Sequence, residues 1–107
     1  MVEKTFKVIV SPIAKVRLKK IYSYYKENVS LEVARKIRNA LLDEADTLKK
    51  RPESKALLRM KKRVVPPYRY IKKWSYKIIF QVFENEDFVS VVDFMHDREN
   101  PNKKEDL

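Results

Sequence analysis

The chain has 107 residues, 44% of them hydrophobic and 37% charged, with a net charge of +10 at neutral pH. Its length and apolar content predict one domain over residues 1–107, with a frayed polar tail from about residue 100, and exclude intrinsic disorder and a membrane span. The sequence has no cysteine, no glycine and one histidine, His96. It therefore lacks disulfides, Gly-rich phosphate loops and paired His or Cys metal ligands, and we expect no metal and no cofactor.

The first half of the chain predicts one strand and two helices. Residues 5–10 are rich in β-branched and aromatic side chains and read as a short strand. Ser11 is a preferred N-cap for a helix running to about residue 26, and Ser30 for a second helix over 31–50. Both segments place apolar residues three and four positions apart, which favours an antiparallel helical hairpin with one buried side.

The second half predicts a β-meander. The pattern over 53–62 is weak and indicates a loop or short strand, whereas 63–71 indicates an extended segment with its two prolines at an edge or bulge. Residues 76–83 and 88–95 are the clearest strands, joined by a turn at 84–87. The fold class is α+β: an N-terminal strand, a helical hairpin, then three or four strands of a mostly antiparallel sheet with both helices on one face.

Positive charge is concentrated in one segment. Residues 49–77 carry twelve Lys or Arg side chains and one acid, Glu53. Its first three bases, at 49–51, suit the negative C-terminal end of the predicted second helix. A solvated face is the simpler interpretation of such a run, but the imbalance exceeds what solubility requires and favours a surface for phosphates or an acidic partner. The nucleic-acid-binding candidates are Arg59, Lys61, Lys62, Arg63, Arg69, Lys72 and Lys73.

The order of these elements and several local signatures resemble the RelE/ParE superfamily of bacterial type II toxins over almost the whole chain. The signatures are Val10-Ser11-Pro12-x-Ala14, Ile21-x-x-x-Tyr25, Leu48-x-x-x-Pro52, Tyr76-Lys77-Ile78-Ile79-Phe80-Gln81-Val82 and Val92-x-x-x-His96-x-Arg98. The resemblance implies a cytoplasmic, growth-inhibiting toxin of a plasmid-stabilisation module. It also implies a cognate antitoxin, acidic and partly disordered, that wraps the helices and sheet of the toxin.

The family divides by target into ribosome-dependent mRNA endoribonucleases, which are RelE-like, and inhibitors of DNA gyrase, which are ParE-like. Lys61, Lys62 and Arg63 match the basic approach of the nuclease branch, and the matching catalytic candidates are Lys77, His96 and Arg98. The ending His96-x-Arg98-x-x-Pro101 looks more like the ParE branch.

Cleavage through the 2′-hydroxyl needs a proton acceptor, a proton donor and cations for the phosphorane charge, which these three side chains supply in principle. The alternative is structural: His96 ends a strand and bonds a neighbour, and Arg98 pairs with Asp93, Asp97 or Glu99. By a small margin we expect a metal-independent mRNA endoribonuclease. The alternatives are a gyrase inhibitor without nuclease activity and a non-toxic nucleic-acid-binding module.

Overall fold

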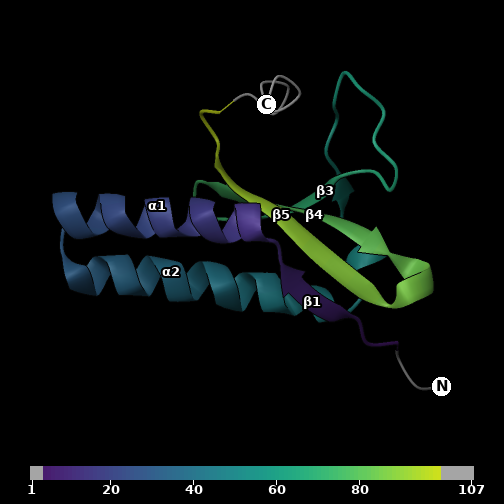
Figure 1. Ribbon diagram of the computed structural model, residues 1–107, viewed down its shortest axis with the longest axis horizontal. Coiled ribbons are helices and arrows are strands. Elements are labelled where there is room, and N and C mark those ends of the chain that lie inside the picture. The colour runs from purple at the N-terminus through teal and green to yellow at the C-terminus, as the bar shows by residue number, and fades with distance from the viewer. Residues whose placement is uncertain (1–3, 100–107) are drawn as a thin grey trace.

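The computed structural model describes residues 4–99 of the chain. Two long helices lie side by side, and a twisted sheet extends beyond one end of the pair (Figure 1). The elements in chain order are β1 (Lys7–Val10), α1 (Pro12–Asn28), α2 (Leu31–Asp46), β2 (Ala56–Leu57), β3 (Arg69–Lys73), β4 (Tyr76–Phe83) and β5 (Phe88–His96). Short 3₁₀ turns at Thr47–Lys49, Pro52–Ser54 and Glu84–Glu86 complete the order. The predicted tail from residue 100 lies outside the described residues.

Serine caps start both helices, as predicted. The Ser11 hydroxyl oxygen accepts a hydrogen bond from the Ala14 backbone N–H at 3.2 Å, and that of Ser30 accepts one from the Val33 N–H at 3.1 Å. Each satisfies one of the N–H groups that the first helical turn leaves without an internal partner. The first helix runs to Asn28, two residues beyond its predicted end.

The second helix is shorter than predicted. Its α-helical part ends at Asp46, and a 3₁₀ turn over Thr47–Lys49 follows. The Thr47 hydroxyl donates to the Glu44 carbonyl at 2.6 Å, and Lys50 forms an antiparallel bridge with Thr5. The prediction that the bases at 49–51 lie at the C-terminal end of an α-helix is therefore wrong, because this segment turns toward the N-terminal strand before it reaches them.

The sheet has five strands in the order β1-β5-β4-β3-β2. β1 runs parallel to β5, and all the other neighbours are antiparallel, which confirms the mostly antiparallel sheet. A register shift between Ile79 and Phe80 marks a bulge in the β4–β5 ladder. Strands β4 and β5 have the predicted bounds within one residue.

Both helices pack on one face of the sheet, as predicted. Leu18 of α1 and Leu41 of α2 meet Ile78 and Phe80 of β4 and Val91 of β5 in a single buried cluster. Leu41, Ile78, Phe80 and Val91 are fully buried, and burying side chains of this size stabilises the fold by about 1.5–3 kcal/mol each. We call the face of the sheet that carries this core the helix face, and the opposite one the outer face.

The segment between β2 and β3 departs from the prediction. The strand begins only at Arg69, so both prolines lie before it in a long loop that projects from the sheet (Figure 1). The Val65–Pro66 peptide bond is cis. A hydrogen bond of 2.8 Å from the Leu58 N–H to the Tyr68 carbonyl closes the base of the loop. The prolines therefore interrupt no ladder, because the chain leaves the sheet where they occur.

Candidate functional site

Two of the three predicted catalytic residues, Lys77 and His96, lie at the open end of the β4–β5 hairpin but on opposite faces of the sheet. Tyr76 lies opposite His96 in the ladder, and Lys77 lies opposite Met95. Residues opposite one another in an antiparallel ladder share a face, and successive residues alternate. Tyr76 belongs to the core cluster, so His96 lies on the helix face and Lys77 on the outer face.

Lys77 is held in an ion-pair cluster on the outer face. Its ammonium nitrogen lies 3.1 Å from one carboxylate oxygen of Asp97, and that of Lys72 lies 2.9 Å from the other. These hydrogen bonds, first from Lys72 and then from Lys77, lower the pKa of the Asp97 carboxyl. The Lys77 ammonium also lies 5.8 Å from the centre of the Tyr70 ring. One carboxylate thus neutralises part of the charge of two lysines.

His96 is engaged in contacts that end the strand. Its ring packs edge-on against Tyr76 at 5.3 Å between centroids, and its Nδ1 accepts a hydrogen bond from the Arg98 backbone N–H at 3.1 Å. The hydroxyls of Tyr76 and Tyr25 lie 3.3 Å apart and share a hydrogen bond. Burial and this bond raise the pKa of Tyr76. The arrangement ties the end of the sheet to α1.

Arg17 of α1 makes a connection that sequence reasoning missed. Its guanidinium lies 3.2 Å from the buried carboxylate of Asp93 and 2.7 Å from that of Glu99. Lys72 and Lys77 hold Asp97, and among residues 4–99 no ion pair to the Arg98 side chain is found. The structural alternative, in which Arg98 pairs with Asp93, Asp97 or Glu99, is therefore not found among the described residues. No local signal points to Arg17, because its partners lie 76 and 82 residues away.

The seven predicted nucleic-acid-binding residues fall into three groups. Arg59, Lys61, Lys62 and Arg63 are exposed in the projecting loop. Lys72 lies beside Lys77 on the outer face, because the two are ladder partners. Arg69 and Lys73 are partners of Phe80 and Tyr76 and so lie on the helix face. The structure therefore divides the predicted basic surface between the loop and the two faces of β3.

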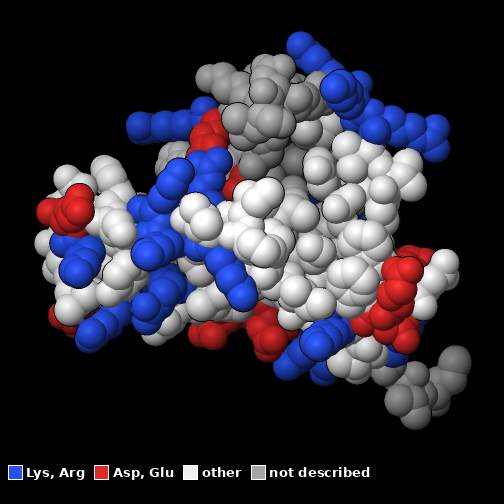
Figure 2. Space-filling view, viewed as in Figure 1, with Lys and Arg blue, Asp and Glu red and all other residues white. Residues whose placement is uncertain are grey.

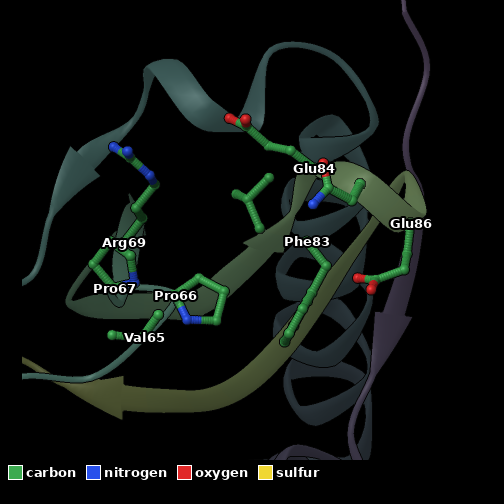
Figure 3. A pocket seen from close by; sticks show the side chains of 9 residues that line it. Val65, Pro66, Pro67, Arg69, Phe83, Glu84 and Glu86 are labelled. Carbon is green, nitrogen blue, oxygen red and sulfur yellow. The ribbon is translucent and has the colours of Figure 1, made fainter.

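Arg69 lies in a cavity of about 470 Å³ between the projecting loop and the end of β4. Its guanidinium donates a hydrogen bond of 2.7 Å to the Lys55 carbonyl. Pro66 and Phe83 line the cavity, and Glu84 and Glu86 lie across it from Arg69 (Figure 3). Two carboxylates beside a single guanidinium disfavour a phosphate in this cavity.

An apolar groove of about 450 Å³ runs between α1 and α2. Leu18, Tyr22 and Leu42 line it together with Val10, Lys15, Lys19 and Arg38. The Arg38 guanidinium carbon lies 5.0 Å from the centre of the Tyr22 ring, so the two helices also contact one another through a cation–π pair. Figure 2 shows that Lys and Arg side chains gather over the helices (blue, at the left).

The described part of the chain offers neither a cluster of metal ligands nor a membrane-spanning helix. Within residues 4–99 there is no group of three or more His, Cys, Asp or Glu side chains placed to hold a metal ion. Over the same range, no helix has both the length and the apolar character needed to cross a membrane.

Comparisons with known proteins place the chain in a family. Several solved structures share its fold, and two of them are described here. The chromosomal ParDE toxin-antitoxin system from P. aeruginosa matches with a TM-score of 0.70 and 17% identity, covering 87% of this chain and 97% of that one. The RelBE2 toxin-antitoxin complex from Mycobacterium tuberculosis matches with a TM-score of 0.64 and 16% identity, covering 86% and 91%.

No curated protein sequence matches the chain. A sequence-family model described as "ParE toxin of type II toxin-antitoxin system, parDE" matches residues 8–101, which is most of the chain. The resemblance to the RelE/ParE superfamily is thereby confirmed, and the chain belongs to the ParE toxin family of type II toxin-antitoxin systems.

Proposed function

We propose that the protein is a cytoplasmic, single-domain toxin that arrests growth by binding DNA gyrase and does not cut RNA. The match to the ParE toxin family over residues 8–101 supports gyrase as the target. The separation of Lys77 and His96 onto opposite faces of the sheet argues against RNA cleavage. General acid–base cleavage requires its proton donor, its proton acceptor and its cations within hydrogen-bond reach of one phosphate. Two side chains on opposite faces of a sheet do not meet at one phosphate.

The contacts of the three candidates support the same conclusion. Lys77 shares the Asp97 carboxylate with Lys72, which reduces the positive charge available to a phosphorane. His96 uses Nδ1 as an acceptor for the Arg98 N–H and packs its ring on Tyr76. Both sets of contacts fit a structural role for the end of the strand.

The second candidate function is the ribosome-dependent mRNA endoribonuclease, favoured by the projecting loop. Arg59, Lys61, Lys62 and Arg63 are all exposed there. A mobile or projecting basic loop is suited to docking on ribosomal RNA, because RNA helices are recognised largely through their phosphates and shape. This observation supports contact with RNA and supplies no group for cutting it.

Two assays run in parallel separate these functions. Purified protein is added to gyrase with relaxed plasmid and ATP, and to ribosomes programmed with a defined mRNA. We expect that gyrase no longer introduces negative supercoils into the relaxed plasmid and that the mRNA stays intact. The proposal is wrong if the mRNA is cut at codon boundaries and Arg98→Ala and His96→Ala both abolish cutting while supercoiling proceeds. Lys36→Met, on the exposed side of α2, serves as the control for unspecific charge loss.

We further propose that a cognate antitoxin neutralises the toxin by laying an acidic, amphipathic segment into the groove between α1 and α2. The groove is apolar and is bordered by Lys15, Lys19 and Arg38, with no acid among the residues that line it. An apolar helix face fits such a groove, and acidic side chains on its flanks complement the three cations.

Two leucines of α2 test this docking. Leu42 lines the groove, whereas Leu31 is similarly exposed at the other end of the helix and does not line it. We expect Leu42→Glu to escape neutralisation when toxin and antitoxin are co-expressed, because it places a carboxylate in the contact, and Leu31→Glu to remain neutralised. Equal neutralisation of both variants would place the antitoxin elsewhere. Growth arrest by each variant alone shows that the toxin still folds.

A further inference from the structure

The turn between β3 and β4 carries the chain's single tryptophan, Trp74. Trp74 and Ser75 form a two-residue connection, and Trp74 has a φ of +53°. Such short hairpin turns favour Gly, Asn or Asp where φ is positive, and a bulky side chain there is strained. The residue is also 53% exposed. Neither local backbone preference nor core packing explains a tryptophan here, which points to a use on the surface.

Cations surround this turn. The Lys73 ammonium lies 5.0 Å from the centre of the Trp74 ring. The Asp97 N–H donates a hydrogen bond of 2.8 Å to the Ser75 carbonyl, which brings the end of β5 beside the turn, and Arg98 is the next residue along the chain. Lys72 and Lys77 already share the Asp97 carboxylate. One carboxylate, Asp97, stands against four basic residues near the turn, Lys72, Lys73, Lys77 and Arg98. The hairpin tip, defined here as Lys72, Lys73, Trp74 and Arg98, therefore keeps a net positive charge beside an exposed indole.

We propose that the hairpin tip binds single-stranded nucleic acid. An unpaired base stacks on the indole of Trp74, and Lys72, Lys73 and Arg98 contact the flanking phosphates. Proteins that bind single strands without sequence preference combine these two elements, an aromatic platform and a cationic path for the backbone. The contact goes beyond the proposed action on gyrase and does not depend on it, since it is made with the nucleic acid alone.

The surroundings of Trp74 favour this partner over a protein. Aromatic anchors of protein interfaces lie among packed apolar neighbours that exclude water. Here Lys73 and Ser75 flank Trp74, the aromatic Tyr76 beyond them is buried in the core, and none of the other exposed large hydrophobic residues in the described range belongs to this turn. A single strand is favoured over a duplex because paired bases in a helix present no free ring face for the indole.

Fluorescence of the single tryptophan tests the stacking directly. The wild-type protein is titrated with an oligothymidylate of about ten nucleotides, which is within the site sizes of single-strand binders, and with a blunt DNA duplex of equal length. We expect the single strand to quench the Trp74 emission and the duplex to bind more weakly with little quenching. An unchanged emission, while anisotropy of a labelled oligonucleotide reports saturation, would overturn the proposal.

Two variants separate the contribution of base stacking to binding from that of the phosphate contacts. Anisotropy with the labelled oligonucleotide should show about tenfold or greater weakening for Trp74→Asn, the range of one lost base stack. Asn tolerates a positive φ, so this variant keeps the turn. Lys73→Met should reduce the salt dependence of binding by about one charge, whereas Lys36→Met on α2 should not. If Trp74→Asn binds as tightly as wild type, the contact is purely electrostatic and base stacking is refuted.

Discussion

The hydroxyl of Tyr76 provides a test of how the end of the sheet is held to α1. Tyr76→Phe removes the hydrogen bond to Tyr25 and keeps the ring in place against His96. A partly buried bond between neutral groups contributes about 1 kcal/mol. We therefore expect urea denaturation near pH 7 to show the variant less stable by about 1 kcal/mol, with an unchanged denaturant slope.

The same variant predicts a distinct pH dependence. The pKa of Tyr76 is raised in the folded protein, by burial and then by the bond to Tyr25. A raised pKa contributes stability below the unfolded pKa, which is about 10 for tyrosine, and this stability is lost as pH rises above it. If Tyr76 ionises only in the unfolded chain, the free energy of unfolding falls by about 1.4 kcal/mol for each pH unit above the unfolded pKa. Because solvent screens this partly exposed group, we expect a loss of about 1 kcal/mol near pH 11.

The free energies of unfolding of the wild type and of Tyr76→Phe should therefore converge near pH 11, because the wild type loses there the stability that the variant lacks at every pH. Urea denaturation at several pH values from neutral to alkaline measures both curves. Tyr68→Phe is the control: the Tyr68 hydroxyl is not among the groups that raise the pKa of Tyr76, and we expect its loss to change neither the stability nor the alkaline slope. A gap between wild type and Tyr76→Phe that stays constant to pH 11 would refute the reasoning.

Three further predictions concern the core, the first helix and the ion-pair cluster. Phe80→Ala should lower the free energy of unfolding by about 3–5 kcal/mol in urea denaturation, because Phe80 is fully buried; a loss below that range would mean that the core collapses around the cavity. Ser11→Ala should lower the stability by about 1 kcal/mol through loss of the N-cap bond, and Ser11→Asn should restore it. The depressed pKa of Asp97 contributes stability above its unfolded pKa, about 3.9, that is lost as pH falls through the folded value. Acid unfolding followed by circular dichroism should therefore have a shallower slope in Asp97→Asn, and added salt should reduce the difference because Lys72 and Lys77 are partly exposed.

Local sequence signals account for most of the elements. The serine caps and the spacing of three and four between apolar residues predicted both helices, since these features act within one or two turns. The runs of β-branched and aromatic residues at 76–83 and 88–95 predicted the two central strands for the same reason. The end of α2 and the start of β3 were missed, because there the chain follows contacts with distant segments, such as the bridge between Lys50 and Thr5.

The geometry of the candidate site depends on strand register and on ion pairs between residues far apart in the sequence, which no local pattern contains. The sequence by itself determined the family, the helical hairpin, the concentration of bases in 49–77 and the identity of Lys77, His96 and Arg98 as candidates. Only the tertiary structure decided that Lys77 and His96 point to opposite faces, that Asp97 is shared by two lysines, and that Arg17 holds Asp93 and Glu99. The physical reason is register. A slip of one residue would move every side chain of the slipped strand to the other face relative to its partner, and the register is set by burial of the whole β4–β5 core.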